Sequence, residues 1–353
     1  AVHAGLPGNP ESFKRLFPAD LQPNGLDIIR TWDYYLMVRH LALFKRAPYK
    51  AMLINGMVRG ADGRMMHKSY GNYVEATEAI LKYGADSLRQ WAAGGAATGQ
   101  DIPFRWSDVD HARRFLTKLW NASRFVIANL REYDRVTEDV ELQMLDRWLL
   151  SRLEKVTEGV TEAFEKFQFN VALESVRNFT WHVFCDQYLE AVKHRLYSKE
   201  LRDRSSRIAA EYVLHRSILR ILQLLAPICP HITESIYQQL KPPAGSPRSI
   251  HSALWPPVKL ELIDDEVEKE GDVVVAVISE IRREKSKRQA SMKAFIRNLY
   301  VYAEENEREI IENNIETVKR TCNISSVNIQ PLDDVSLGTS IQEYANIRIR
   351  LEF

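Results

Sequence analysis

The chain has 353 residues, of which 45% are hydrophobic and 27% are charged, so it is long enough for two or three globular domains and too apolar for a disordered tail. Its 48 Lys and Arg residues nearly balance its 47 Asp and Glu residues, so overall charge predicts no polyanionic partner and only local patches can attract one. Three Cys residues, Cys185, Cys229 and Cys322, lack C-x-x-C spacing, which excludes a zinc ribbon or a disulfide framework and favours the cytoplasm. No run of about 18 apolar residues predicts a membrane span.

Residues 1–107 alternate short strand-like runs, Gly turns and helices. The run "PYKAMLI", residues 48–54, predicts a strand, and "YVEATEAILKYGADSLRQW", residues 73–91, predicts a helix. Between them lies the loop "GRMMHKSYGN", residues 63–72. This pattern is half of an α/β unit, because a complete parallel sheet needs more strands than the region offers.

Residues 108–270 have a different pattern. Apolar residues recur at i, i+3, i+4 and i+7 in three long segments, residues 110–130, 144–167 and 172–197, which predicts the helices of a bundle. A linker rich in Pro, residues 241–262, ends this period and is expected to run over the bundle surface.

Residues 271–353 predict a small α+β domain. It begins with a helix-like run at residues 272–290 and continues with alternating strand-like runs at residues 297–303, 325–330 and 345–353. A further helical segment, residues 307–321, lies between the first two of these strands. The predicted fold is therefore α/β followed by mainly α, with a small α+β unit at the end.

The loop at residues 63–72 carries one Lys, Lys68. Backbone N–H groups at a helix start together with one ammonium suit a polyphosphate. The G-x-x-x-x-G-K-[ST] order of a Walker loop is absent. From the residues alone, a surface loop whose Lys68 points into water stays an open alternative.

Several motifs resemble those of class I aminoacyl-tRNA synthetases. "RMMHKSYGN" resembles their K-M-S-K-S-x-G-N loop, and "NGLDIIRTWDYY" is similar to the G-x-D-I-x-R-T-W segment of the valine, isoleucine and leucine branch. "YGADSLRQWAAGGAATGQDIPF" and "KLWNASRF" are similar to the A-D-x-L-R element of that branch and to a helix of valyl-tRNA synthetases, especially archaeal and eukaryotic ones. The resemblance covers essentially the whole chain and is weakest after Gly271.

This resemblance implies an architecture and an activity. Residues 1–107 would be the second half of a Rossmann-like nucleotide-binding domain with a stem-contact region, and residues 108–270 an anticodon-binding bundle. The activity would be that of a valine–tRNA ligase, which forms valyl-adenylate from valine and ATP with Mg²⁺ and then charges tRNA(Val). The resemblance further implies a cytoplasmic monomer in full-length form, with no membrane partner and no metal site of its own. A fragment of an isoleucyl-tRNA synthetase and a tRNA-binding module without catalysis stay open.

The resemblance also assigns roles to single residues. Lys68 matches the second Lys of the loop motif and would meet charge that develops on the phosphates. Ser69 matches the final Ser, and Gly71 with Asn72 would shape the turn. The ATP-binding positions are two near the ribose and three around the adenine: Gly25 and Asp27, then Asn55, Gly56 and Met57. Trp32 matches an aromatic residue that lines the amino-acid pocket.

The chain departs from the family pattern in two respects. Met65 and His67 replace the first Lys and first Ser of the loop, which removes an ammonium worth about 1–3 kcal/mol beside a polyphosphate. We hypothesise that Arg64 supplies the missing charge. The H-x-G-H sequence of the first half of the fold and the editing domain are also absent from these residues. The chain is therefore interpreted as a C-terminal portion of a synthetase and is predicted not to form the adenylate alone.

Two basic segments are candidates for tRNA contact. Both also fit a solvated charged face. The helix predicted over "DHARRFLTKLWNASRFVIANLR", residues 110–131, carries Arg113, Arg114, Lys118, Arg124 and Arg131. The run "RREKSKRQASMK" carries Arg282, Arg283, Lys285, Lys287, Arg288 and Lys293. The pairs His182 with Cys185 and Cys229 with His231 lack a second ligand pair and are interpreted as structural.

Overall fold

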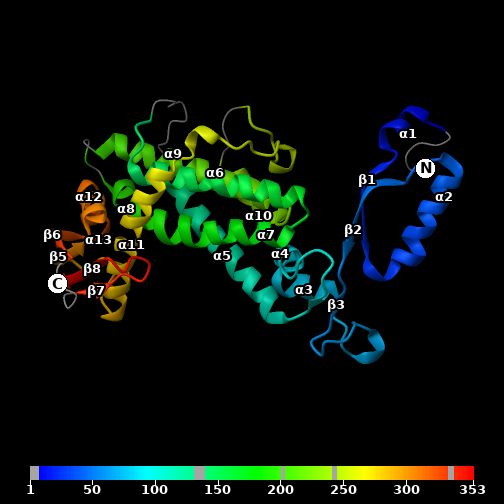
Figure 1. Ribbon diagram of the computed structural model, residues 1–353, viewed down its shortest axis with the longest axis horizontal. Coiled ribbons are helices and arrows are strands. Elements are labelled where there is room, and N and C mark those ends of the chain that lie inside the picture. The colour runs from blue at the N-terminus through cyan, green and yellow to red at the C-terminus, as the bar shows by residue number, and fades with distance from the viewer. Residues whose placement is uncertain (1–7, 131–139, 199, 201–202, 241–244, 333–337) are drawn as a thin grey trace. The chain divides into compact units, whose positions relative to one another are not determined.

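A computed structural model describes residues 8–130, 140–198, 200, 203–240, 245–332 and 338–353 (Figure 1). The chain divides into two compact units. Unit 1 comprises residues 1–114 and 160–174, and unit 2 comprises residues 115–159 and 175–353. Three helices contribute residues to both units: α5 (Trp106–Asn129), α6 (Met144–Glu165) and α7 (Phe169–Asn178).

Unit 1 begins with a βαβ arrangement. Helix α1 (Pro10–Leu16) precedes strand β1 (Ala19–Gly25), and helix α2 (Tyr34–Phe44) leads to strand β2 (Tyr49–Asn55), which pairs with β1 in parallel. A π-helical turn, Ile29–Asp33, joins directly to α2. Helix α2 has no buried residue, and several of its apolar side chains are exposed.

The rest of unit 1 surrounds the loop that the sequence singled out. Strand β3 (Val58–Arg59) pairs in parallel with β4 (Ile102–Pro103), and helices α3 (Ala76–Tyr83) and α4 (Ala85–Gly94) lie between them in sequence. Ala79, Trp91, Phe104 and Val109 form a small core. The prediction of a single helix at residues 73–91 is wrong. Two helices form instead, because Gly84 interrupts the segment with a φ of 85°, which other residues adopt only with strain.

Unit 2 is a helical bundle with a large apolar core, as the period of the sequence predicted. Its further helices are α8 (Leu189–Tyr197), α9 (Arg204–Leu225) and α10 (Pro230–Leu240). Trp148, Tyr188, Phe184 and Leu214 are among its fully buried side chains. A ten-residue π-helical segment, Phe179–Tyr188, interrupts the predicted helix at residues 172–197.

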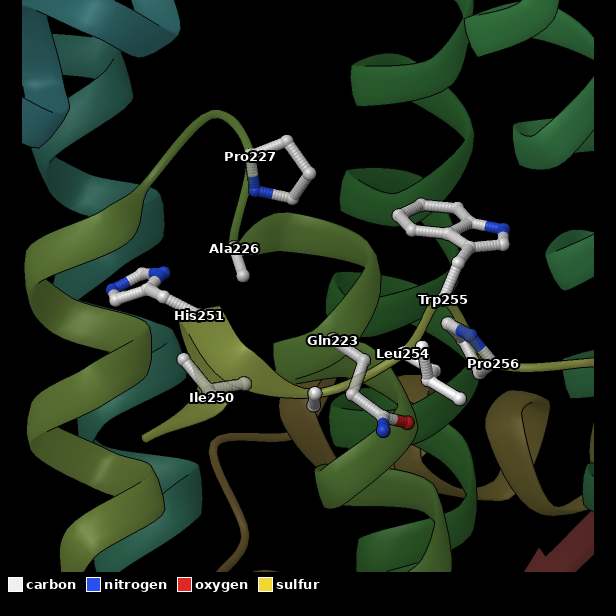
Figure 2. A pocket seen from close by; sticks show the side chains of 9 residues that line it. Gln223, Ala226, Pro227, Ile250, His251, Leu254, Trp255 and Pro256 are labelled. Carbon is white, nitrogen blue, oxygen red and sulfur yellow. The ribbon is translucent and has the colours of Figure 1, made fainter. Parts of the chain in front are cut away.

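The linker contacts the bundle through polar and apolar side chains. Glu234 on α10 accepts hydrogen bonds from Ser249 Oγ (3.0 Å) and Ile250 N (2.9 Å). Figure 2 shows Leu254 and Trp255 of the linker beside the end of α9, where they help to line a cavity of about 240 Å³. The linker is thus packed along the bundle, in agreement with its predicted course.

The chain ends in a small α+β arrangement. Helix α11 (Asp265–Lys287) is followed by β5 (Ile296–Ala303), α12 (Glu305–Asn313), α13 (Ile315–Cys322), β6 (Ile324–Pro331), β7 (Thr339–Ser340) and β8 (Ile347–Glu352). The strand order is β6–β5–β8–β7, with β5 and β6 parallel and the other pairs antiparallel. The predicted fold class, α/β followed by mainly α with a small α+β end, is confirmed.

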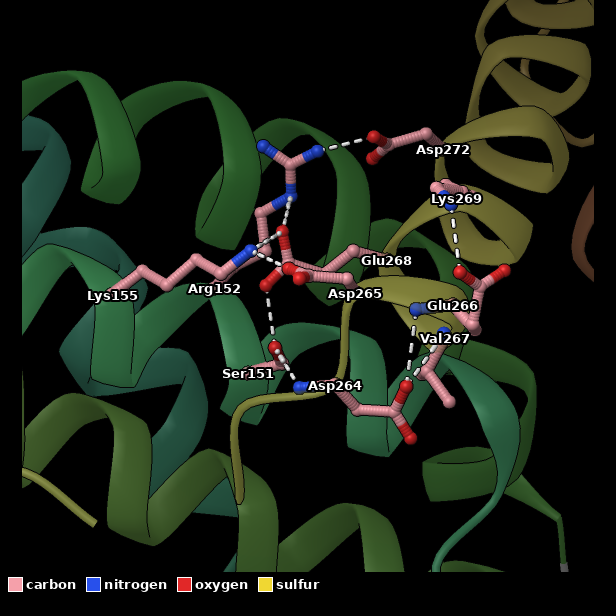
Figure 3. A network of polar contacts seen from close by, with 10 residues as sticks. All are labelled: Ser151, Arg152, Lys155, Asp264, Asp265, Glu266, Val267, Glu268, Lys269 and Asp272. Atoms are coloured by element: carbon pink, nitrogen blue, oxygen red, sulfur yellow. Dashed lines mark hydrogen bonds and ion pairs between the residues drawn. The ribbon is translucent and has the colours of Figure 1, made fainter. Parts of the chain in front are cut away.

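A network of charged side chains fixes the start of α11 against α6 (Figure 3). Lys155 pairs with Asp265 and Glu268, and Arg152 pairs with Asp272. Asp264 caps the helix by accepting hydrogen bonds from Glu266 N and Val267 N. Helix α11 therefore begins before residue 271, where the sequence suggested a domain boundary.

Candidate functional site

The predicted ATP-binding residues of β1 and β2 lie together at the carboxyl ends of these strands. Gly25 is paired with Asn55 in the parallel register. A Cβ atom placed on Gly25 would lie 2.6 Å from Asp27 Oδ1 and 3.5 Å from Met57 Sδ. Carboxyl ends of parallel strands are where α/β folds bind ligands, so this cluster has a suitable location.

Gly56 allows a close approach between two segments of backbone. A Cβ atom on Gly56 would lie 1.8 Å from the carbonyl oxygen of Gln100, so any side chain here would displace the segment at residues 99–101. Next to it, Met57 N donates a hydrogen bond to Asp101 Oδ1 (2.8 Å), and Arg59 Nε donates one to Asp101 Oδ2 (2.7 Å). The Met57 amide, and then Arg59, hold the pKa of Asp101 below its ordinary value. Asp101 thus fixes the Gly56–Met57 peptide, a role that the sequence did not suggest.

Asp62 and Asn72 brace the loop at residues 60–72. Asp62 Oδ1 accepts hydrogen bonds from Arg64 N (3.0 Å) and from Asn72 Nδ2 (3.1 Å). Asn72 also accepts one from His67 N (2.9 Å) and donates one to the Met65 carbonyl (3.1 Å). The Asn72 amide, and then the Arg64 amide, lower the pKa of Asp62. These bonds hold the two ends of the loop together, and Asp62 was also missed from sequence.

Lys68 stands at the exposed side of this loop. It opens a short 3₁₀ turn, Lys68–Tyr70, which ends at Gly71 with a φ of 66°. Ser69 Oγ lies 2.7 Å from His67 Nδ1, so His67 has a contact within the turn. The Lys68 side chain is 76% exposed, with Nζ 3.9 Å from Glu75 Oε1 and 5.3 Å from the centre of the Tyr73 ring. Its ammonium is therefore accessible to a ligand from solvent.

Arg64 is engaged within the same loop. Its Nε lies 2.8 Å from Asp62 Oδ2, and its guanidinium carbon lies 5.2 Å from the centre of the Tyr70 ring. To take the place of the missing Lys, Arg64 would have to leave Asp62. The structure brings Arg64, Lys68, Ser69 and Gly71 into one loop, and the strand-end residues into a second cluster.

Trp32 lies on the π-helical turn that precedes α2. Its side chain is 55% exposed, and exposed apolar side chains continue along the turn and α2: Ile29, Tyr34, Tyr35, Met37, Val38, Leu41 and Leu43. The next residue, Asp33, is buried and accepts a hydrogen bond from Asn24. Trp32 therefore presents an apolar surface rather than the wall of an enclosed pocket.

The basic residues proposed for tRNA contact mostly form ion pairs. In unit 1, Arg113 and Arg114 pair with Asp110. In unit 2, Lys118 pairs with Asp186 (2.7 Å) and lies 4.0 Å from the centre of the Trp181 ring, while Arg124 is exposed. On α11 the cations and their partners are Arg282 with Glu190, Arg283 with Glu280, and Lys287 and Arg288 with Glu284. Arg131 lies outside the described residues.

Lys285 is buried, whereas the sequence suggested that all the cations of the run at residues 282–293 are solvated. Its side chain is only 1% exposed, and its ammonium donates hydrogen bonds to the carbonyl oxygens of Met292, Ala294 and Cys322. It joins the start of β5 and the end of α13 to α11. A surface role for Lys285 is therefore wrong.

The three Cys side chains are buried thiols. Burial raises the pKa of Cys185 and of Cys322 to about 12, so both are protonated at neutral pH. Among the described residues, no group of three or more His, Cys, Asp or Glu side chains is arranged to hold a metal ion. In that same part of the chain, every helix is too short or too polar to cross a membrane.

Two family models match the chain. Residues 2–105 match the tRNA synthetases of class I (I, L, M and V), and residues 146–300 match the anticodon-binding domain of tRNA ligase. Two solved structures are similar in fold. They are the LeuRS–tRNA–LeuAMS ternary complex of Agrobacterium radiobacter K84 (TM-score 0.59, 21% identity, 73% of this chain and 32% of that chain) and a Mycobacterium tuberculosis methionyl-tRNA synthetase with methionyl-adenylate (TM-score 0.60, 23% identity, 72% and 52%).

Curated relatives are more similar in sequence. The valine–tRNA ligase of Methanothermobacter thermautotrophicus is 42% identical over 92% of this chain, and that of Pyrococcus horikoshii is 40% identical over 85%. The chain spans about a third of these relatives, 36% and 34% of their lengths. The matched models and the relatives agree with the architecture described above: the first part of the chain is similar to class I tRNA synthetases, residues 146–300 are similar to their anticodon-binding domain, and the chain is similar to part of the valine–tRNA ligases.

Proposed function

We propose that the chain is the part of a valine–tRNA ligase that supplies the phosphate-facing loop and the tRNA-binding region. The whole enzyme would activate valine with ATP to valyl-adenylate and transfer the valyl group to tRNA(Val). The observation that carries this proposal is the exposed ammonium of Lys68 on a loop braced by Asp62 and Asn72. The similarity to valine–tRNA ligases supports the choice of amino acid.

Lys68 acts on the leaving group in this proposal. When the valine carboxylate attacks the α-phosphate, the bond to pyrophosphate breaks and negative charge grows on the departing diphosphate. An ammonium that meets this charge lowers the barrier, because the interaction is stronger in the transition state than in the ground state. To do so, Lys68 gives up a 3.9 Å contact with the exposed Glu75 and its position over the Tyr73 ring, and such exposed contacts contribute little.

The strand-end cluster holds the nucleoside. The Asp27 carboxylate accepts hydrogen bonds from the two ribose hydroxyls, and the backbone of Asn55, Gly56 and Met57 flanks the adenine. Support for the second role is the close contact of Gly56 with Gln100 and the bond from Met57 N to Asp101, which keep that peptide in one position. Mg²⁺ enters with the ATP phosphates, whose oxygen atoms it prefers as ligands. Trp32 contributes an apolar surface for the valine side chain.

Within the described part of unit 1, the elements that carry this site leave apolar surface uncovered. Parallel sheets are normally covered on both faces, whereas β1 and β2 form only two strands and the neighbouring α2 exposes its apolar side chains. Leu43 on α2 is 74% exposed. We infer that further residues of the complete enzyme cover this surface and complete the contacts to ATP, and that the isolated chain does not form valyl-adenylate.

The tRNA contacts belong to the bundle and α11. The proposed residues are Arg113, Arg114, Lys118, Arg124, Arg282, Arg283 and Lys287. Their exposed ion pairs are individually weak, so phosphate groups can compete for the cations. Exchange of each cation for Ala would then weaken binding of tRNA(Val) and reduce its salt dependence.

The test is valine-dependent ATP–pyrophosphate exchange in an enzyme restored to full length. Lys68→Ala should slow exchange by about 10²–10³-fold, the usual cost of one group that stabilises transition-state charge. Lys14→Ala, which removes an exposed Lys of α1, is the matched control and should leave exchange unchanged. Exchange at the normal rate in Lys68→Ala would refute the role of Lys68, and exchange by the isolated chain would refute its dependence on further residues.

Arg64 needs a test of its own because Asp62 engages it. In the same assay, Arg64→Ala should slow exchange severely if the guanidinium replaces the missing Lys of the loop. Arg64→Lys should retain part of the activity, since it restores a cation. An unaffected rate in Arg64→Ala would leave Arg64 with only its bonds to Asp62. The alternative that the chain is part of an isoleucyl-tRNA synthetase is tested by running the exchange assay with isoleucine in place of valine. The two substrates differ by one methylene, which is worth about 1–3 kcal/mol in an apolar pocket.

A further inference from the structure

A cavity of about 400 Å³ opens in unit 2 between α8, the end of α11 and α13. Its volume falls within the range of about 300–1,000 Å³ that is common for pockets that bind small molecules. Five cationic side chains line it: Lys193 on α8, Arg282 and Lys285 on α11, Lys293 on the following turn, and Arg320 on α13. Neither the loop at residues 60–72 nor the strand-end cluster contributes to it.

Within the part of the chain that the structure describes, the ion pairs of these cations involve fewer carboxylates than cations. Glu190 pairs with both Lys193 (2.5 Å) and Arg282 (3.2 Å), and it also lines the cavity. Asp203 pairs with Arg320 (3.1 Å). Three of the five cations therefore pair with two carboxylates, and Lys285 and Lys293 take part in neither set of pairs. The excess positive charge favours an anion inside the cavity.

Lys285 gives the strongest reason for an anion. Its ammonium is buried, and the three groups that accept its hydrogen bonds are neutral carbonyl oxygens at 3.2, 2.8 and 2.7 Å. Burial, and to a lesser extent Arg282, lower the pKa of Lys285. A buried charge is costly unless an opposite charge lies near it. Because its three N–H groups are already used, Lys285 would act on an anion through its charge, while neighbouring side chains make the direct contacts.

The cavity also has an aromatic side chain at its edge. Tyr197, at the end of α8, lines the cavity and is 61% exposed. Its ring and that of Phe125 lie edge to face, with ring centres 6.4 Å apart, and most of the Tyr197 side chain is exposed. A flat base can stack on an exposed aromatic ring whatever its sequence identity. Met292, which also lines the cavity, adds apolar surface.

We propose that this cavity binds a phosphorylated nucleoside. The phosphate lies against Arg282, Lys293 and Arg320, and the base lies against Tyr197. The ligand is either a free nucleotide or one nucleotide of an RNA strand, since the two share this chemistry. The RNA alternative rests on the tRNA-binding role proposed above, because Arg282 is common to both, whereas a free nucleotide would be a separate ligand of unit 2.

The test measures binding to the whole 353-residue chain by titration calorimetry at low salt. The probes are adenosine 5′-monophosphate, adenosine, inorganic phosphate and a short single-stranded RNA of mixed sequence. The monophosphate should bind at least about 10-fold more tightly than adenosine, because charge-assisted hydrogen bonds to phosphate are the strong contacts. Its affinity should fall as salt is added.

Variants then locate the site. Lys293→Ala and Arg320→Ala should each weaken monophosphate binding by about 10-fold. Tyr197→Ala should weaken binding of the monophosphate but not of inorganic phosphate, which separates the base from the phosphate. Lys269→Ala is the matched control, because it removes an exposed cation of α11 that does not line the cavity. Circular dichroism and thermal melting verify that each variant is folded.

The outcomes separate the two sources of the ligand. Binding of the monophosphate without RNA assigns the cavity to a free nucleotide. Binding of RNA without the monophosphate assigns it to a strand if Lys293→Ala and Arg320→Ala weaken RNA binding, and overturns the proposal if they do not. The proposal is overturned if neither binds, if adenosine binds as well as its monophosphate, or if Lys269→Ala loses as much affinity as Lys293→Ala. Loss of exchange activity in Lys68→Ala bears on a different unit and leaves this result unaffected.

Discussion

Helices α2 of unit 1 and α9 of unit 2 are both rich in apolar residues, yet they are used differently. Helix α2 has no buried residue, whereas more than half of the 22 residues of α9 are buried. Burial contributes roughly 25 cal/mol per Å² of apolar surface, so α9 supports the bundle and α2 contributes little as it stands. The difference indicates that α9 forms part of the apolar core of unit 2, whereas the apolar side chains of α2 are exposed, as the proposed cover from further residues requires.

The largest effect should come from a buried charge of the bundle. Asp146 is buried and accepts two hydrogen bonds from Arg195 (2.8 Å each) and one from the hydroxyl of Tyr188 (2.6 Å). Asp146→Ala leaves the buried guanidinium unpaired and should lower the free energy of unfolding by about 3–5 kcal/mol in urea titrations. Asp20→Ala, which removes an exposed pair between Asp20 on β1 and Lys50 on β2, should change the free energy of unfolding little. Equal losses in both variants would break the comparison.

The effect of removing an apolar side chain from each helix can be compared at two Leu residues. Leu214 on α9 is fully buried, and Leu41 on α2 is half exposed. Leu214→Ala should cost about 2–5 kcal/mol of stability, because it leaves a cavity. Leu41→Ala should stay within about 0.5 kcal/mol. A large loss for Leu41→Ala, measured by the same urea titration, would mean that α2 is already covered in solution.

A smaller effect should appear with pH. Burial lowers the pKa of His194 on α8 from 6.5 to about 4. Between these values the unfolded chain binds a proton that the folded chain does not, so His194 contributes stability above pH 6.5 that is lost as pH falls toward 4. The loss should be about 2 kcal/mol after allowance for partial exposure. Urea titrations at several pH values should give a flatter profile for His194→Gln than for the wild type, and identical slopes would assign the pH dependence to other groups.

Sequence predicted the elements whose signals are local. The apolar period of residues 110–130 and 144–167 matches α5 and α6 within a few residues. The same period gave no sign of the π-helical segment Phe179–Tyr188, since side-chain spacing hardly changes there. The sequence also predicted that Lys285 is exposed. It could not predict its burial, because the carbonyl groups that bind its ammonium, those of Met292, Ala294 and Cys322, are up to 37 residues away along the chain.

The candidate site was predictable to a similar degree. The structure groups the loop residues around Lys68 and the strand-end residues around Gly25, and their roles stay predictions. The bracing acids Asp62 and Asp101 were missed, because an Asp in a turn has the signature of a solvated turn residue. Asp62 acts through Asn72, ten residues further on, and Asp101 acts through Met57, 44 residues earlier. Only the folded chain relates such positions.

Helix α11 has a consequence for anyone who wishes to trim this polypeptide. Gly271 leaves room for the indole of Trp148, since a Cβ atom there would lie 2.2 Å from Trp148 Cδ1, and the indole N–H donates to Asp272 (2.9 Å). The same helix continues to Lys285, which holds the terminal strands. A truncation at residue 270 would keep only the first six residues of this helix and would remove both Gly271, which packs on the indole, and Asp272, which accepts its N–H. A shortened protein should therefore keep the whole of α11, and preferably the terminal sheet that Lys285 connects to it.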